Sequence, residues 1–283
     1  MPGLTERLLY RVAKRWIAGY TLEDAIKVAH DANNRELRAI LNRLGEHTPD
    51  QKLIQSYTEE YLKLLDRIRA ERIEGTISVK PSQIGLAANP TLYNSNLRGI
   101  VEKAETCDEF VWIDMENSPY TEATIRSYSE IFPSYPRLGV CLQANMKRTE
   151  SDLKDLLPRG GIVRLVKGAY PENAEVAYKK RSDVDANYLK LMAILFEQGD
   201  HFGIGTHDGK LIDKARILSQ DYKRDFEFQL LKGIRDDVKP NLVKEGYRVS
   251  EYIPYGPEWY NYSKRRMRER KRNILLLLRS ITG

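Results

Sequence analysis

The 283-residue sequence has two cysteines, Cys107 and Cys141, and four histidines. This content supplies neither a disulfide framework nor a metal-binding spacing, so we expect no metal site and a reducing, cytoplasmic environment. No apolar run approaches the roughly 18 residues of a membrane-spanning helix. The first residues also lack the apolar core of a secretory signal. We therefore expect neither a secreted disulfide scaffold nor an integral membrane protein.

Glycine-rich phosphate loops are also missing, because neither GxGxxG nor GxxxxGK[ST] occurs. This absence argues against an open, doubly wound nucleotide-binding sheet. Positive charge is present instead: 46 Lys and Arg stand against 40 Asp and Glu, a net charge of +6. Such a balance suits nucleic acid, an anionic membrane surface or a site for anionic small molecules. Composition leaves these three partners open.

Short β-like runs alternate with helical runs along the chain. Helices are predicted at 4–18 and from Thr21, where Thr21 and Asp24 resemble a capping pair. Eight strands follow, each with a helix after it, although the first is also compatible with a helix. The predicted strands are 37–44, 76–80, 109–114, 137–142, 161–166, 202–206, 225–230 and 247–253. The helices after the first seven are expected at 51–71, 94–106, 121–132, 149–157, 183–199, 209–219 and 235–245.

Eight βα units in a chain of this length predict an α/β fold, a (β/α)₈ barrel of the TIM type. We expect N-terminal helices over about 1–35 and the barrel over about 36–283, together one catalytic domain. An open doubly wound sheet is the alternative. A barrel places its active site at the carboxyl ends of the strands.

Polar side chains stand at nearly all of the predicted strand ends. A charge inside an apolar run there faces a cavity or a partner, because isolated burial is costly. Each also has a structural interpretation: Lys80 as an ion-pair partner of Asp114, for example, or His207 as a loop histidine. The strand-end residues are Glu46, Lys80, Asp114, Glu116, Gln143, Arg164, Lys167, Thr206, His207, Gln229, Leu231, Tyr252 and Tyr255.

Two clusters favour a binding site. Gly168 and Ala169, between Lys167 and Tyr170, allow close backbone approach, and with Arg164 they suit a phosphate-bearing aromatic cofactor. After the last strand, Tyr252 to Glu269 turns at Pro254 and Gly256 and becomes a basic helix. Its Tyr262, Arg265, Arg266 and Glu269 fall on one helical face, where two guanidinium groups can grip one carboxylate. A solvated charge run is the alternative.

Several segments together resemble the proline dehydrogenase family over about residues 20 to 270. The resemblance implies a distorted (β/α)₈ barrel with noncovalent FAD. It implies oxidation of L-proline to Δ1-pyrroline-5-carboxylate, the first step of proline catabolism, with electrons passed to a quinone or another acceptor. The segments, in order, are ISVKPSQIGL, DME, CLQANMKR, VRLVKGAY, GTHD, FEFQLLKG and YIPYG followed by YSKRRMRE.

The resemblance also implies roles for individual residues. Lys80, Arg265 and Arg266 would hold the proline carboxylate, and Asp114 would orient them. Glu46 resembles a gate residue that pairs with Arg265. The ring walls would be Tyr170, Leu231, Tyr252 and Tyr262. The flavin contacts would be Gln143, Arg164, Val166, Lys167, Gly168, Ala169, Thr206, His207, Gln229 and Glu269.

Three positions depart from the commonest pattern of the family, and they concern detailed contacts to the cofactor. Pro81 stands where Leu is more usual, Pro171 where Trp is frequent, and Asp208 where Asn is common.

The sequence leaves two alternative functions open. A related flavoenzyme could act on hydroxyproline or another cyclic imino acid, and Tyr252 is then the position to examine. A basic nucleic-acid-binding protein would use residues 264–272, but it leaves the polar strand ends unexplained. We therefore expect no nucleic-acid partner.

The last residues allow two interpretations. The apolar run Ile274 to Leu278 is expected to pack on the barrel, as short apolar stretches usually do. The alternative is transient docking on an anionic bilayer, which would make a cytoplasmic protein peripheral to the inner face of the membrane.

Overall fold

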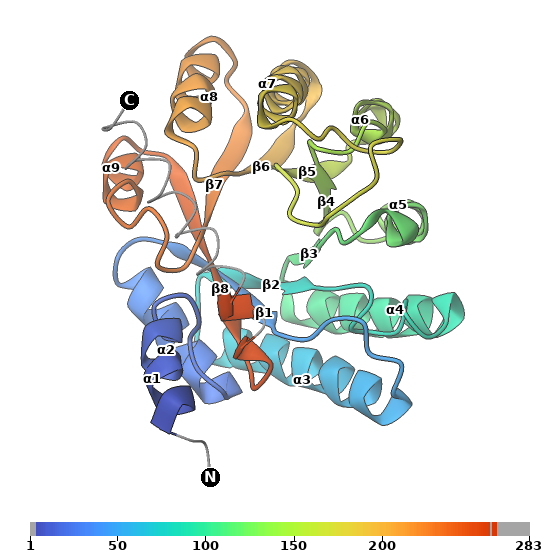
Figure 1. Ribbon diagram of the computed structural model, residues 1–283, viewed down its shortest axis with the longest axis vertical. Coiled ribbons are helices and arrows are strands. Elements are labelled where there is room, and N and C mark those ends of the chain that lie inside the picture. Colours follow the sequence, from blue (N-terminus) through green and yellow to red (C-terminus); the bar gives the residue numbers. More distant parts are fainter. Residues whose placement is uncertain (1–3, 261, 265–283) are drawn as a thin grey trace.

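The computed structural model describes residues 4–260 and 262–264. In this part of the chain, eight parallel strands close into a barrel in sequential order, and helices surround it (Figure 1). The strands are β1 (Arg38–Arg43), β2 (Gly75–Val79), β3 (Val111–Ile113), β4 (Leu138–Gln143), β5 (Ile162–Val166), β6 (His201–Gly205), β7 (Asp225–Leu231) and β8 (Arg248–Tyr255). The predicted TIM-type (β/α)₈ barrel is confirmed.

The helices follow the same alternation. They are α1 (Leu4–Ala13), α2 (Leu22–Asn33), α3 (Gln51–Ala70), α4 (Pro90–Cys107), α5 (Ser118–Ile131), α6 (Thr149–Leu156), the 3₁₀ turn η1 (Leu157–Arg159), α7 (Arg181–Gln198), α8 (Gly209–Asp221) and α9 (Lys239–Lys244). Within the described residues, no helix is both long and apolar enough to cross a membrane. The predicted basic helix that includes Tyr262 lies mostly outside the described residues, and the apolar run Ile274 to Leu278 lies wholly outside them.

The strand β1 settles the ambiguity at 37–44. It pairs with β2 through Ala39 and Gly75 and with β8 over six residue pairs from Arg38–Ser250 onward. A helix at this position would leave the barrel open between β8 and β2. Its strand conformation therefore closes the sheet and removes both edges.

Of the two N-terminal helices, the start of α2 agrees with the prediction and the end of α1 does not. Thr21 and Asp24 form the predicted capping box at the start of α2. The first helix was predicted to reach residue 18 but ends at Ala13. A turn over 14–16 follows, and Ala18 then donates a backbone hydrogen bond to the Pro254 carbonyl, at 2.8 Å, which joins this segment to β8. Pro254 was predicted to lie in a turn, but it is part of β8.

The two faces of the strands have opposite character. Residues such as Val140, Leu165 and Phe228 are fully buried in the continuous apolar core between the strands and the helices. The interior of the barrel is unusual, because TIM barrels are commonly filled by branched aliphatic side chains. Here the Trp112 ring occupies the space beside Gly139, where a Cβ would lie 2.4 Å from it. Polar side chains fill the interior toward the carboxyl ends of the strands.

Candidate active site

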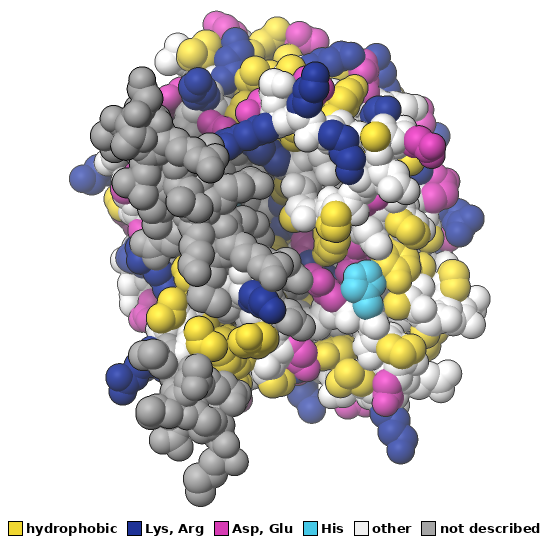
Figure 2. Space-filling model, in the orientation of Figure 1, with side chains coloured by type: hydrophobic (Ala, Val, Ile, Leu, Met, Phe, Trp, Pro, Cys, Tyr) yellow, Lys and Arg dark blue, Asp and Glu magenta, His cyan; other side chains and the backbone are white. Residues whose placement is uncertain are grey.

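A cavity of about 1200 Å³ opens at the carboxyl ends of the strands. Acidic and basic side chains lie close together near the centre of the face drawn in Figure 2. Every site residue expected from the resemblance that the structure describes lies on the cavity wall. These are Glu46, Lys80, Asp114, Gln143, Arg164, Val166, Lys167, Gly168, Ala169, Tyr170, Thr206, His207, Gln229, Leu231, Tyr252 and Tyr262. Arg265, Arg266 and Glu269 lie outside the described residues, so their predicted roles stay predictions.

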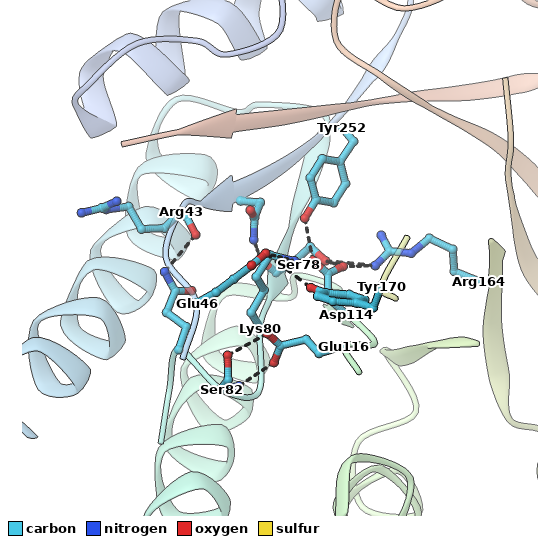
Figure 3. A network of polar contacts seen from close by, with 12 residues as sticks. Arg43, Glu46, Ser78, Lys80, Ser82, Asp114, Glu116, Arg164, Tyr170 and Tyr252 are labelled. Carbon is cyan, nitrogen blue, oxygen red and sulfur yellow. Dashed lines mark hydrogen bonds and ion pairs between the residues drawn. The ribbon is translucent and has the colours of Figure 1, made fainter. Parts of the chain in front are cut away.

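Asp114, just past the end of β3, is the centre of the polar network in Figure 3. Its Oδ1 accepts hydrogen bonds from Ser78 Oγ at 2.6 Å and from Arg164 Nη2. Its Oδ2 accepts from Lys80 Nζ at 3.0 Å and from the Tyr252 hydroxyl at 2.6 Å. Four donors, two from β2 and its carboxyl end and one each from β5 and β8, therefore converge on one buried carboxylate.

These contacts fix the charges of the network. Burial alone would raise the pKa of Asp114, but Lys80 and Arg164 outweigh burial and hold that pKa well below its usual range. Burial would lower the pKa of Lys80, but Asp114 raises it well above the ordinary value. The pKa of Tyr252 is also raised, by burial and then by Asp114. At neutral pH the site thus holds a carboxylate, an ammonium group and a neutral phenol.

Arg164, on β5, lies between two aromatic rings. Its guanidinium carbon is 5.1 Å from the centre of the Trp112 ring and 5.7 Å from that of Tyr252. Its Nη1 donates to Gln229 Oε1 at 3.2 Å, and Nη2 reaches Asp114. Ion pairing, two cation–π contacts and hydrogen bonds hold this buried cation in one orientation.

The rim beside Lys80 is formed by Glu46 and Tyr170. Lys80 Nζ lies 3.7 Å from Glu46 Oε1, and the Tyr170 hydroxyl donates to the same oxygen at 3.3 Å. The pKa of Tyr170 is raised, first by burial, so its hydroxyl stays protonated. Lys80 therefore lies between Asp114 below and Glu46 at the rim, with its ammonium group on the cavity wall.

A second ionic cluster lies where β5 and β6 end. Lys167 Nζ contacts Asp185, on α7, and donates to Asp208 Oδ2 at 2.8 Å. Burial would raise the pKa of Asp208, but the hydrogen bond from Lys167 outweighs burial and lowers it. Asp208 Oδ1 also caps α8 by accepting from the Lys210 backbone at 3.1 Å. The unusual Asp at this position therefore both starts a helix and fixes a lysine at the cavity.

Gly168 and Asn145 form a tight contact on the cavity wall. Gly168 has a φ of +102°, and a Cβ there would lie 2.1 Å from Asn145 Oδ1, so no other residue fits. That oxygen is buried and has no hydrogen-bond partner among the described residues. A buried acceptor without a donor is costly. It is therefore available to a donor group of a molecule bound in the cavity.

Two strand-end predictions were wrong, because Glu116 and Tyr255 do not line the cavity. Glu116 is fully buried and accepts from the Ser82 backbone and hydroxyl, both at 2.7 Å. It follows Asp114 by two positions, but β3 already ends at Ile113, so strand alternation no longer applies. Tyr255 lies three positions after Tyr252 in β8 and thus on the opposite face.

Sequence reasoning missed other residues of the site. Ser78 precedes Lys80 by two positions on the same strand face, so alternation alone could have identified it. Asn145 lies in the segment CLQANMKR, but nothing in the sequence distinguishes it from a loop residue. Asp185, on α7, reaches the site only because the segment 167–180 folds over the cavity, for which we find no sequence signal. Among the described residues, no three metal-binding side chains converge.

The chain is similar to known proteins over nearly its whole length. A family model described as proline dehydrogenase matches residues 25–274. "Proline dehydrogenase 1" of Bacillus subtilis subsp. natto is 34% identical over 272 residues, which cover 95% of this chain and 90% of that protein. "Proline dehydrogenase" of Deinococcus radiodurans is 32% identical over 289 residues, 98% of this chain and 92% of that protein.

Solved structures resemble the fold. "Proline utilization A (PutA)" from Bdellovibrio bacteriovorus superposes with a TM-score of 0.86 at 22% identity, over 94% of this chain and 33% of that one. The protein of the same name from Corynebacterium freiburgense gives 0.77 at 21% identity, over 93% of this chain and 31% of the other. This chain therefore spans about a third of these longer proteins. At such identity they support the barrel fold alone.

Proposed function

This chain belongs to the proline dehydrogenase family, and on that premise we propose that its cavity oxidises L-proline to Δ1-pyrroline-5-carboxylate beside noncovalently bound FAD. The observation that carries the proposal is the network of Lys80, Asp114, Arg164 and Tyr252 at the carboxyl end of the barrel. It combines fixed cations, a fixed anion and an aromatic wall in one cavity. These are the groups that a small zwitterionic ring requires.

Lys80 is the described cation best placed for the carboxylate of proline. Its pKa is raised by Asp114, so it remains an ammonium group, and its side chain is 13% exposed at the cavity. Asp114 holds it by one hydrogen bond, which leaves two of its three N–H groups for other acceptors. Arg265 and Arg266, predicted to complete the grip, remain part of this proposal.

The residues on the cavity wall fit an isoalloxazine and its phosphate-bearing chain. The cavity is larger than the roughly 300–1,000 Å³ of most small-molecule sites. Asn145 Oδ1 offers an acceptor that lacks a donor, and Gly168 brings backbone close to the cavity. The flavin contacts that we assign are Gln143, Arg164, Val166, Lys167, Gly168, Ala169, Thr206, His207 and Gln229. FAD, when bound, would supply the acceptor for the hydride that leaves C5 of proline.

Charge control is the task of the protein in this reaction. Loss of a hydride from C5 and of a proton from nitrogen converts the amine of proline into an imine. Asp114 cannot take that proton at neutral pH, because its pKa is held low, so it acts as an anchor for Lys80 and Arg164. The two tyrosines Tyr170 and Tyr252 keep their protons and supply walls for the ring. Positioning and fixed charges, without a covalent intermediate on the protein, then suffice.

Reduced FAD must pass its electrons to an acceptor, for which a quinone is our proposal. Docking of the C-terminal segment on an anionic bilayer, the alternative to its packing on the barrel, would bring the protein to quinone, and that segment lies outside the described residues. Liposome sedimentation separates the two: binding at low salt supports docking, and its absence removes the docking hypothesis.

The absorption spectrum of the purified, FAD-reconstituted protein tests the main proposal. We expect flavin bands that bleach when L-proline is added without oxygen. An acid extract should release FAD, and FMN in that extract would correct the cofactor. A colourless protein after reconstitution, or bands that saturating proline leaves unchanged, would refute the proposal. Bleaching by trans-4-hydroxy-L-proline alone would favour the related imino-acid oxidation instead.

A further inference from the structure

The segment FEFQLL contains one carboxylate with no role in the proposed reaction. Glu227 points from β7 into the barrel, and its side chain is only 6% exposed. Its Oε1 accepts a hydrogen bond from Gln229 Nε2 at 2.5 Å, and its Oε2 accepts from Ser250 Oγ at 2.6 Å. In the described part of the chain its ion-pair partner is Arg38, whose Nη1 lies 4.0 Å away on a half-exposed side chain. Glu227 is absent from the cavity wall.

These contacts determine which way the amide of Gln229 faces. A carboxylate can only accept, so Gln229 must present its Nε2 to Glu227. The Oε1 of the same amide is then directed to Arg164 Nη1, at 3.2 Å. Arg164 in turn reaches Asp114, to which Lys80 and Tyr252 are bound. A directed chain of hydrogen bonds thus connects Glu227 to the substrate end of the barrel.

The neighbouring strand β6 leaves room for this series of hydrogen bonds. Gly203, on β6, pairs with Glu227 on one side and with Arg164 on the other. A Cβ on Gly203 would lie 2.8 Å from Gln229 Nε2 and 3.5 Å from Arg164 Cβ. A larger residue at this position would displace the amide of Gln229 from its contact with Arg164. The sequence therefore makes space for the Glu227–Gln229–Arg164 chain at the cost of interior packing.

We propose that Glu227 is a positioning residue that fixes Gln229, and through it Arg164, in the orientation that binds the flavin. This inference rests on the proposed function, because it needs a flavin at Arg164. It does not require Glu227 to touch the cofactor or the substrate. Replacement by glutamine removes the fixed direction of these hydrogen bonds. An amide at 227 can donate or accept, so it no longer determines the orientation of the Gln229 amide.

The test uses Glu227→Gln in the full chain, with Glu251→Gln as the matched control. Glu251 is also buried, on the adjacent strand β8, and it forms ion pairs with Lys239 and Arg35 outside the barrel. Both variants lose one buried carboxylate, and the control also breaks a buried ion pair, so it sets an upper limit for the effect of lost stability on FAD binding. Only Glu227→Gln is expected to weaken FAD binding, by about five- to tenfold, the range of one internal hydrogen bond.

Two measurements decide the outcome. The first is the FAD dissociation constant by titration, with thermal melts to confirm folding. The second is a crystal structure of Glu227→Gln without flavin, in which the contact between Gln229 Oε1 and Arg164 should be lost. Wild-type FAD affinity in Glu227→Gln, equal weakening in Glu251→Gln, or an unmoved Gln229 and Arg164 would each overturn the inference. Failure of the wild-type protein to bind FAD would instead refute the proposed function, while the crystal structure still tests the positioning.

Discussion

Two buried lysine–carboxylate pairs in this barrel have the same chemistry and different surroundings. Lys239 and Glu251 lie between the strands and α9, with side chains 1% and 2% exposed and a contact of 2.6 Å. Lys80 and Asp114 lie at the cavity, 13% and 9% exposed and 3.0 Å apart. Burial of an ion pair therefore does not identify a functional site, because both pairs are buried. The difference lies in how many donors of each lysine are already used.

The donors of Lys239 are fully used. Its Nζ donates to Glu251, to Asp236 at 2.7 Å and to the Leu231 carbonyl at 3.0 Å. An ammonium group has three N–H donors, so nothing remains for a ligand. Lys80 makes one hydrogen bond, to Asp114, among the described residues. The outer pair therefore has no donor left for a ligand, whereas under the proposed function the cavity pair would receive the carboxylate of the substrate.

The largest effect is expected from Lys239→Met. It leaves Glu251 buried, with the half-exposed Arg35, 3.1 Å away, as its one remaining cation among the described residues. Removal of one partner from a buried pair typically costs about 3–5 kcal/mol of stability. Denaturant unfolding measures this loss, and we expect kcat/KM of the folded fraction to stay close to the wild-type value. A stable but inactive variant would reverse the assignment of the two pairs.

Lys80→Met is expected to show the opposite pattern. Asp114 keeps Arg164, Ser78 and Tyr252 as donors, so the melting temperature changes little. Loss of a charged contact to the proline carboxylate should lower kcat/KM about ten- to a hundredfold, from ~1.5–3 kcal/mol per contact. Steady-state kinetics measures the change in kcat/KM, and thermal melts measure the change in stability. Wild-type kinetics would remove Lys80 from the carboxylate site.

The sequence predicts much of the surroundings of the Lys80–Asp114 pair at the cavity and little of the Lys239–Glu251 pair. Lys80, Asp114 and Arg164 stand at or near strand ends, and a barrel must bring those ends together. Glu116 was wrongly predicted to line the cavity with them, because the alternation of residue types does not show where β3 ends. The pairing of Lys239 with Glu251 depends on how α9 packs on β8, which no local pattern specifies. The hydrogen bond between Arg164 and Ser78 could not be predicted either, because it depends on the register of strands that are far apart in the sequence.

The pH dependence of stability gives a third comparison. The pKa of Asp114 is lower in the folded protein than its ordinary value of 3.8. Its contribution is therefore present above that value and is lost as the pH falls below it, by at most about 1.4 kcal/mol per pH unit. Unfolding free energies between pH 5 and pH 3, in the wild type and in Asp114→Asn, should give a shallower slope for the variant. Parallel slopes would show that Asp114 is not held ionised by its neighbours.

The smallest effect is expected from Glu46→Gln. Glu46 lies at the rim, 3.7 Å from Lys80, and its side chain is 19% exposed. Partly solvated pairs contribute ~0.2–1 kcal/mol, so we expect KM for proline to change less than about fivefold, with unchanged melting. Kinetics at several salt concentrations checks this, because salt weakens such a pair. A hundredfold change would place Glu46 among the groups that bind substrate directly.

The central claim, that Lys80 and not Lys239 recognises the carboxylate of the substrate, is tested most directly with pyrrolidine. Pyrrolidine has the ring of proline and no carboxylate. The ratio of kcat/KM for L-proline to kcat/KM for pyrrolidine therefore reports carboxylate recognition alone. We predict that Lys80→Met lowers this ratio about tenfold or more while Lys239→Met leaves it unchanged. An unchanged ratio in Lys80→Met, or an equal fall in both variants, would contradict the account.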